Sequence, residues 1–193
     1  MVRRIAVILA GGRSARMGGR DKALAELGGI RLIDRAIARL APQADRIVIS
    51  GRRDYGTGLA AIADEKSGPQ GPAAGIFAVS RWMAQNEAST EGFFTAPVDG
   101  PFLPGDLAQR LGACGGPAVA ADDGGVHPTF AYWTLRALDG AWEKLRGAPS
   151  ISLRGLAGAS KATEVRWAGT GLFFNVNTRE DLRVAAMRQD TDR

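Results

Sequence analysis

The segment best suited to bind a ligand is a glycine-rich stretch near the N-terminus, Leu9-Ala10-Gly11-Gly12-Arg13-Ser14-Ala15-Arg16-Met17-Gly18-Gly19-Arg20-Asp21-Lys22. Its glycines allow positive φ angles and let the backbone approach a ligand without side-chain obstruction. Successive N–H groups in such a loop form a concave site for phosphate oxygens, and four cationic side chains add positive charge where a triphosphate would lie. The spacing matches neither the P-loop nor the dinucleotide fingerprint. We expect a nucleoside triphosphate site here; the alternative, a glycine-rich turn with solvated arginines, leaves so many glycines and cations without a reason.

A second candidate is Asp99, which follows the apolar run Phe93–Val98. A carboxylate at the carboxyl end of a buried strand is well placed to hold Mg²⁺, a hard cation that prefers oxygen ligands. The alternative is a turn aspartate, since Gly100-Pro101 comes next. The residues alone leave these two interpretations open.

Three further positions carry polar groups beside turns or predicted element ends. Asp64 precedes the glycine-proline segment Gly71–Gly75 and, on its own, is typical of a solvated carboxylate. His127 is the only histidine of the chain, and a lone histidine is more often structural than catalytic. With a single cysteine as well, the chain lacks the usual nitrogen and sulfur ligands of a zinc site. The segment Asn175-Val176-Asn177-Thr178 lies just before a predicted helix, where Thr178 has the type of an N-cap residue.

These candidates are distributed along an alternation of buried strands and amphipathic helices. A continuous apolar run predicts a buried strand over Ile5–Ala10. Strand patterns follow over Arg46–Ser50, Gly92–Val98 and His127–Trp133. Helical spacing predicts helices over Leu32–Leu40, Gly75–Ala84, Pro104–Leu111 with its proline in the first turn, Leu135–Arg146, and after Thr178 with Asp181 completing a variant capping box. Such alternation indicates an α/β fold: three-layer, Rossmann-like, with a mostly parallel sheet flanked by helices. Ligands bind such sheets beyond the carboxyl ends of their strands.

Composition limits the class of protein. The 193 residues fit a single domain spanning 1–193, and 45% hydrophobic with 23% charged residues is typical of a globular protein. No apolar stretch approaches the roughly 20 residues of a membrane span, and one cysteine makes no internal disulfide, so we expect a cytoplasmic protein. A net charge of +5 favours anionic partners. Without a basic run interleaved with aromatic residues, phosphorylated small molecules are favoured over nucleic acid.

The pattern Leu-Ala-Gly-Gly-x-x-x-Arg-Met-Gly-Gly-x-Asp-Lys resembles the signature of the molybdenum cofactor guanylyltransferases, within the sugar-nucleotide-type nucleotidyltransferases. The resemblance runs from about Ile5 to Leu182 and is densest in the first loop and at Asp99. It implies an Mg²⁺-dependent enzyme that transfers GMP from GTP to the phosphate of molybdopterin and releases pyrophosphate. The sister cytidylyltransferases usually carry Leu-Ala-Ala-Gly, so Gly11-Gly12 favours guanine.

The resemblance also implies roles for individual residues. It makes Arg16, Lys22 and Asp99 catalytic, with Asp99 holding the Mg²⁺. It assigns the nucleotide to Leu9, Ala10, Gly11, Gly12, Lys22, Ser50, Asp64 and Asp99, with base and ribose on Leu9–Gly11. It places His127, Asn175 and Asn177 on the pterin side. Because the attacking phosphate is already anionic, no side-chain base is required.

Two positions depart from the family pattern. Ser50 stands where guanylyltransferases commonly have asparagine near the base, and a serine makes one hydrogen bond where an amide makes a pair. The stretch Gly147–Ser150 lacks an arginine often found there, and Arg146 and Arg154 are the two candidates to replace it.

The departures keep other functions open. One is the same fold and chemistry with CTP as donor or a sugar 1-phosphate as acceptor. Another, of a different class, is a non-catalytic module that binds a pterin or nucleic acid. The expected partners are GTP and molybdopterin as substrates, and the resemblance allows transient contact with other molybdenum-cofactor proteins.

Overall fold

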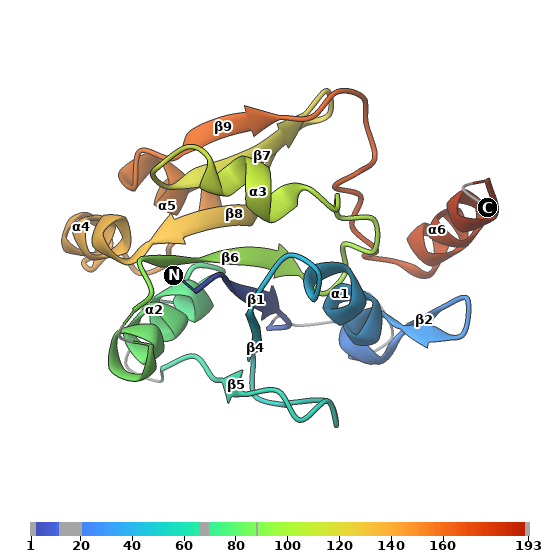
Figure 1. Cartoon of the computed structure of the whole chain (residues 1–193), viewed down its shortest axis with the longest axis horizontal. Coiled ribbons are helices and arrows are strands. Elements are labelled where there is room, and N and C mark those ends of the chain that lie inside the picture. Colours follow the sequence, from blue (N-terminus) through green and yellow to red (C-terminus); the bar gives the residue numbers. More distant parts are fainter. Residues whose placement is uncertain (1–2, 12–20, 66–69, 88, 192–193) are drawn as a thin grey trace.

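A computed structural model of the chain describes residues 3–11, 21–65, 70–87 and 89–191. Its centre is a seven-stranded sheet with the strand order β5-β4-β1-β6-β8-β7-β9 (Figure 1). Four of the strand pairings are parallel and two are antiparallel. The predicted α/β fold with a mostly parallel sheet is confirmed.

The parallel half of the sheet is built around the first strand. β1 (Ile5–Leu9) lies between β4 (Arg46–Ser50) and β6 (Gly92–Pro97), and the two-residue β5 (Ala61–Ile62) pairs with β4 at the edge of the sheet. In this register Leu9 lies opposite both Ser50 and Pro97. Because these strands run in one direction, their carboxyl ends share one edge of the sheet, which we call the carboxyl edge.

The other half reverses direction and still contributes to the carboxyl edge. β8 (Gly125–Thr134) runs antiparallel to β6, and β7 (Ala118–Asp122) runs antiparallel to β8. The last strand, β9 (Thr163–Arg166), is parallel to β7. The start of β8 therefore lies at the same edge as the end of β6, and so does the tight turn between β7 and β8.

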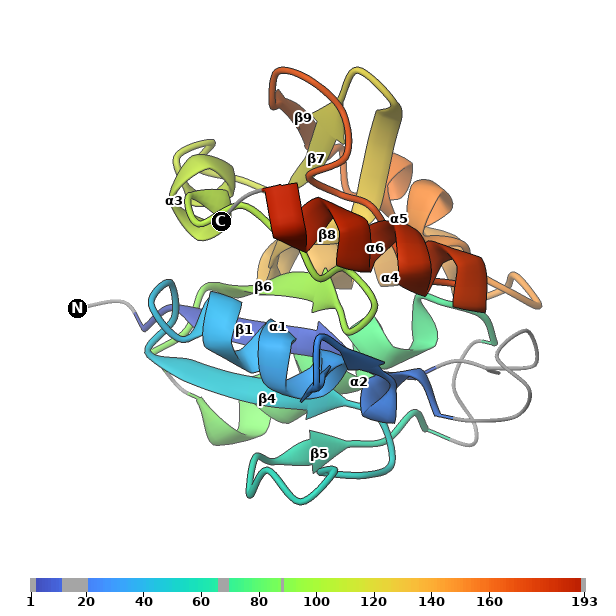
Figure 2. The same ribbon diagram turned by 90° about the vertical axis from the view of Figure 1, so that its right-hand side faces the viewer.

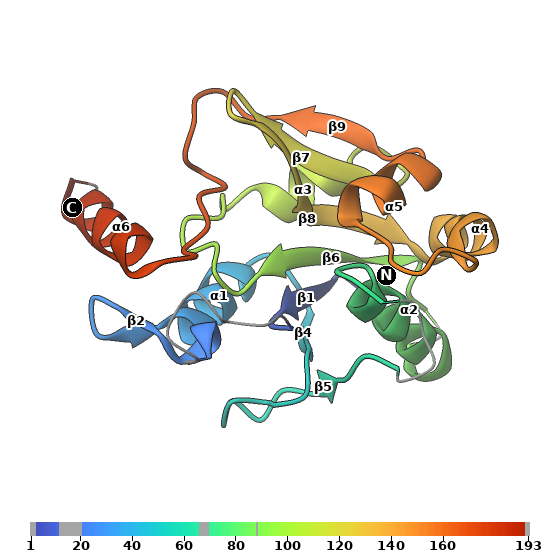
Figure 3. The ribbon, with the colours of Figure 1, turned by 180° about the vertical axis from the view of Figure 1, so that it is seen from behind.

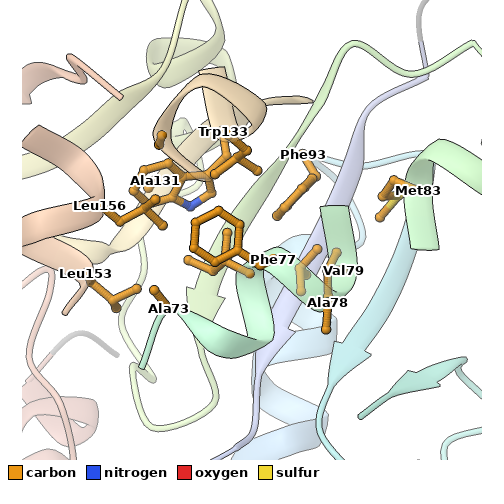
Figure 4. Packing of buried hydrophobic residues seen from close by; sticks show 14 of the residues in the cluster. Ala73, Phe77, Ala78, Val79, Met83, Phe93, Ala131, Trp133, Leu153 and Leu156 are labelled. Atoms are coloured by element: carbon orange, nitrogen blue, oxygen red, sulfur yellow. The ribbon is translucent and has the colours of Figure 1, made fainter. Parts of the chain in front are cut away.

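Helices cover both faces of the sheet, which confirms three layers (Figure 2). α2 (Ala74–Asn86), α4 (Leu135–Leu145) and α5 (Leu153–Ala159) pack on one face, around Phe77, Phe93 and Trp133 (Figure 4). α1 (Leu32–Leu40) and α3 (Leu107–Gly112) pack on the other. β1 serves both cores because its side chains alternate: Ile5 and Val7 point to the first core, Ala6 and Ile8 to the second.

The C-terminal helix lies apart from the sheet. α6 (Arg179–Thr191) packs beside β2 (Glu26–Leu27), which pairs with β3 (Ile30–Arg31) after a single 3-10 turn over Lys22–Leu24 (Figures 1 and 3). A small third core joins these elements through Leu27, Leu32, Val176 and Ala185. In the described part of the chain, no helix is long and apolar enough to cross a membrane.

One predicted boundary is wrong. Pro104 was expected in the first turn of a helix, but α3 begins at Leu107 with Asp106 as its N-cap. The Pro104 carbonyl instead accepts hydrogen bonds from the Leu107 amide at 3.3 Å and from the buried Gln43 side chain at 3.1 Å. The tertiary contact with Gln43 and the turn at Gly105-Asp106 delay the helix by three residues.

Candidate functional site

Three predicted site residues meet at the carboxyl edge. The Lys22 ammonium donates to Asp99 Oδ2 at 2.8 Å and to Asn177 Oδ1 at 2.6 Å. The three residues come from the first loop, the end of β6 and the segment before α6. The Lys22 and Asp99 side chains are only 20% and 15% exposed, so their ion pair is partly shielded from water.

The backbone around Asp99 is held on both sides. The Val98 amide donates to the Leu9 carbonyl at 3.1 Å, and the Val176 amide donates to the Asp99 carbonyl at 2.8 Å. Gly100 is required in this turn, because a Cβ there would lie 2.5 Å from the Phe130 ring. Close packing therefore fixes the direction in which the Asp99 carboxylate leaves the strand.

Asn177 is positioned by the start of α6. Asp181 Oδ2 accepts from the Asn177 and Thr178 amides at 2.8 and 2.9 Å, and Thr178 Oγ1 accepts from the Asp181 amide at 3.0 Å. These bonds, led by the one from Asn177, hold the pKa of Asp181 below its usual value. The predicted capping box of Thr178 and Asp181 is confirmed.

The start of the glycine-rich loop runs against the end of β4. The Ala10 amide donates to the Ser50 carbonyl at 3.0 Å, and a Cβ on Gly11 would lie 3.9 Å from the same oxygen. Tyr55 approaches the Ala10 carbonyl, with its hydroxyl at 3.5 Å. Burial, helped by the charge of Asp21, raises the pKa of Tyr55 to about 12, so its phenol is neutral at physiological pH.

Ser50 and Asp64 meet at the first turn of α2. A Cβ on Gly75 would lie 2.4 Å from Ser50 Oγ and 3.1 Å from Asp64 Oδ1. The missing side chain of Gly75 thus leaves room for a buried hydroxyl and an exposed carboxylate beside the helix. This role of Gly75 was not predicted; a glycine where a helical pattern begins was the available signal.

His127 lies at the same edge but is bound elsewhere. Its Nε2 donates to Asp122 Oδ1 at 2.8 Å, and its ring packs on Phe173 at 4.9 Å between centroids. Burial acts to raise the pKa of Asp122, but hydrogen bonds from His127 and from the Gly124 and Gly171 amides outweigh it and lower that pKa. Asp122 was not among the predicted residues, because nothing in the sequence distinguishes it from an exposed turn aspartate.

Gly12 and Arg16 lie outside the described residues. Within the described ranges the Asn175 side-chain oxygen is buried without a hydrogen-bond partner. Arg146 pairs with Glu143 on the exposed surface of α4, whereas Arg154 reaches toward the Val126 carbonyl at 3.5 Å, one residue from His127.

The donor atoms near Lys22 fit a magnesium ion that is completed by substrate. The described residues contain no group of three or more histidine, cysteine or acidic side chains that could hold a metal ion by themselves. Asp99 Oδ2 and Asn177 Oδ1 both accept from the Lys22 ammonium, which occupies the point on which they converge, so a metal ion would be held by Asp99 beside that cation. Mg²⁺ is commonly bound by one or two carboxylates together with substrate phosphates and water.

The chain is similar to known nucleotidyltransferases over most of its length. Residues 6–161 match the model of the MobA-like NTP transferase domain. A molybdenum cofactor guanylyltransferase of Cereibacter sphaeroides is 40% identical over 192 residues, covering 94% of either chain. Another, of Acidiphilium cryptum, is 38% identical over 185 residues, covering 93% of this chain and 92% of the relative. Among solved structures, molybdopterin-guanine dinucleotide biosynthesis protein A from Archaeoglobus fulgidus has the same fold, with a TM-score of 0.72 at 22% identity over 97% of this chain and 99% of that one.

Proposed function

The chain belongs to the MobA-like NTP transferase family, and from that membership we propose that it transfers GMP from GTP to the phosphate of molybdopterin, forming molybdopterin guanine dinucleotide. The observation that carries the proposal is the Lys22 ammonium between Asp99 and Asn177, directly after the phosphate-type loop. The cation proposed to bind the donor, the carboxylate proposed to bind the metal ion and the segment proposed to bind the acceptor thus lie in one place.

The reaction needs positioning and charge neutralisation more than proton transfer. An oxygen of the molybdopterin phosphate forms a bond to the α-phosphorus of GTP, and the bond from that phosphorus to the β-phosphate bridging oxygen breaks. Pyrophosphate leaves with the electron pair. The nucleophile is already anionic, so the protein contributes fixed cations and oriented donors, as in other phosphoryl transfers.

The Lys22 ammonium is the cation that we assign to the triphosphate. An ammonium has three donor hydrogens, and two are used by Asp99 and Asn177. We propose that the third contacts an oxygen of the triphosphate, so that Lys22 joins the donor phosphate and the acceptor segment. A bound Mg²⁺, held by Asp99 beside Lys22, would offset charge on the phosphate oxygens.

The nucleoside belongs at the opposite end of the loop, on Leu9–Gly11. There Ser50 and Asp64 lie side by side at Gly75 and are the polar groups that we assign to the nucleoside. Ser50 is also the observation that favours the second candidate, the same reaction with CTP, because its hydroxyl lacks the paired contact that an asparagine makes with a base.

The test is pyrophosphate release from GTP, CTP and UTP with Mg²⁺ and molybdopterin, in the wild type, in Asp99→Asn and in Asp139→Asn. Asp139 is an exposed carboxylate on α4 and serves as the matched control. We expect release from GTP only, lost in Asp99→Asn and on chelation of the metal, and retained in Asp139→Asn. Release from CTP instead would move the protein to the cytidylyl reaction.

No release from any nucleotide, with an acceptor shown to be active, would refute transfer altogether. A binding module would then be the better hypothesis. Steeply salt-dependent binding to nonspecific DNA would identify nucleic acid as its ligand.

A further inference from the structure

The chain between β9 and α6, residues 167–178, crosses the carboxyl edge without regular secondary structure (Figure 2). We call it the strap. It carries Asn175 and Asn177, and Asn177 contacts Lys22. A segment without its own ladder of hydrogen bonds keeps its shape only through bonds to its neighbours. What holds the strap therefore determines where these asparagines lie.

The turn between β7 and β8 holds the first half of the strap. The Asp123 amide donates to the Gly169 carbonyl at 3.1 Å, and the Gly169 amide donates to Asp123 Oδ2 at 2.9 Å. The Gly171 amide donates to the Asp122 carboxylate. Both glycines have positive φ, 82° and 94°, so the strap bends at the two points where the turn binds it.

Asp122 is the centre of this arrangement. Its side chain is 3% exposed, yet its carboxylate is ionised because it accepts from His127, Gly124 and Gly171. A buried carboxylate is tolerated only when such donors surround it. The bond to His127 uses Nε2 and fixes the plane of the imidazole ring.

His127 connects Asp122 to the second half of the strap. Its ring lies on Phe173, 4.9 Å between centroids with an angle of 31°. Phe173 also contacts Phe130 and Trp167, and it lies two residues before Asn175. Asp122 thus acts on the strap twice, directly at Gly171 and through the His127 ring at Phe173.

We infer that Asp122 is a positioning residue for the acceptor: with His127 it holds the strap so that Asn175 and Asn177 receive the pterin phosphate substrate. The inference rests on the proposed function, which supplies the identity of that substrate. His127 then orients the strap rather than contacting substrate through Nε2. The donor nucleotide, bound at Leu9–Gly11, does not depend on this pair.

The experiment compares Asp122→Asn with Asp45→Asn. Asparagine keeps the shape of Asp122 but removes its charge. Asp45 is a matched control, since its carboxylate also accepts a backbone amide, that of Arg4 at 2.8 Å, away from the strap. We expect the KM for molybdopterin to rise about tenfold in Asp122→Asn, while the KM for GTP stays within about twofold and Asp45→Asn matches the wild type.

A second measurement needs no turnover. Hydrogen exchange of residues 167–178 in the ligand-free protein is expected to accelerate in Asp122→Asn and in His127→Gln, with exchange in β1 and β4 unchanged. The double variant is expected to resemble either single one, because both changes break one connected network. Additive effects would indicate that the two residues act separately.

The outcomes are distinguishable. An active Asp122→Asn variant with both KM values unchanged would overturn the inference, as would unchanged exchange in the strap. Equal losses for both substrates, with faster exchange throughout the chain, would show a purely structural role. Failure of the proposed function would instead appear in the wild type as absent pyrophosphate release, and exchange in the strap would then decide whether Asp122 holds it.

Discussion

Gly75→Ala tests whether the space beside the first turn of α2 is kept open for function. The new Cβ would lie 2.4 Å from Ser50 Oγ. That oxygen must retreat by about 1 Å to regain an ordinary contact of 3.4 Å. Asp64 Oδ1, at 3.1 Å and on an exposed side chain, needs only a few tenths of an ångström. The change therefore acts mainly on the buried Ser50 hydroxyl.

The expected magnitude follows from one hydrogen bond. If Ser50 binds the nucleoside as proposed, displacing its hydroxyl costs about 0.5–1.5 kcal/mol, which is about a two- to twelvefold loss in kcat/KM for GTP. Stability changes little, because alanine improves a helix over glycine by about 1 kcal/mol and the crowding at Ser50 offsets part of that gain. Activity and stability are thus expected to separate.

The assay is kcat/KM for GTP at saturating molybdopterin, together with the thermal midpoint. Gly140→Ala is the matched control, since Gly140 lies in α4 with nothing within 4 Å of its added Cβ. It is expected to raise the midpoint by roughly 2–4 °C without changing turnover. Ser50→Ala is expected to lose as much activity as Gly75→Ala, and the double variant no more. Wild-type kcat/KM in Gly75→Ala, or a double variant far below Ser50→Ala, would refute this reasoning.

Three further predictions concern charge. Lys22→Met is expected to lower turnover at least about 100-fold with a near-wild-type thermal midpoint. The control is Lys144→Met, which removes an exposed ammonium bound to a carbonyl. Equal activity of the two variants would contradict the role of Lys22. The pKa of Asp181 is lowered on folding, so the ionised carboxylate stabilises the folded protein above its unfolded pKa of about 3.9, and this stabilisation is lost as pH falls. In acid unfolding profiles, the difference in stability between the wild type and Asp181→Asn is expected to shrink below about pH 4. Burial raises the pKa of Tyr55 to about 12 and also raises that of Tyr132; ultraviolet titration is expected to show little phenolate until well above pH 10, and stability to fall as pH rises toward the folded pKa. Two phenols titrating normally in the folded protein would refute that packing.

The fold was predictable where side chains are buried on a regular period. β1 is an uninterrupted apolar run, β4 has three consecutive apolar residues between Arg46 and Ser50, and β6 is buried at every position. α1 has a clear amphipathic spacing. Two of the elements that were missed, α5 and β9, lack such a signal. α5 contains two glycines, which disfavour a helix, and depends on its N-cap Ser152, which accepts from the Gly155 amide at 3.0 Å. β9 is an edge strand with mostly exposed side chains. The β2–β3 hairpin did have a signal, Gly28-Gly29 between two apolar residues, and both glycines have positive φ.

The candidate site was predictable as a set of motifs, but its geometry was not. Lys22, Asp99 and Asn177 were each assigned through family resemblance, and the structure places them within hydrogen-bonding distance. Asp122 could not be found in the same way. Its carboxylate accepts a hydrogen bond from the Gly171 amide, 49 positions later in the sequence, and no local pattern encodes such a contact.

The direction of β8 explains why one sheet can hold two substrates. β6 is parallel to β1 on one side and antiparallel to β8 on the other, so the topology changes at the strand that precedes Asp99. Ligands of open α/β sheets bind where the strand order changes. On the proposed function, the parallel half carries the first residues of the glycine-rich loop, Ala10 and Gly11, for the donor, while the reversed half carries the β7–β8 turn and the strap for the acceptor. In-line transfer requires the attacking phosphate oxygen and the leaving pyrophosphate to lie on opposite sides of the α-phosphorus. On the proposed function, Asp99 and Lys22 lie where the two halves of the sheet meet, between the two substrates.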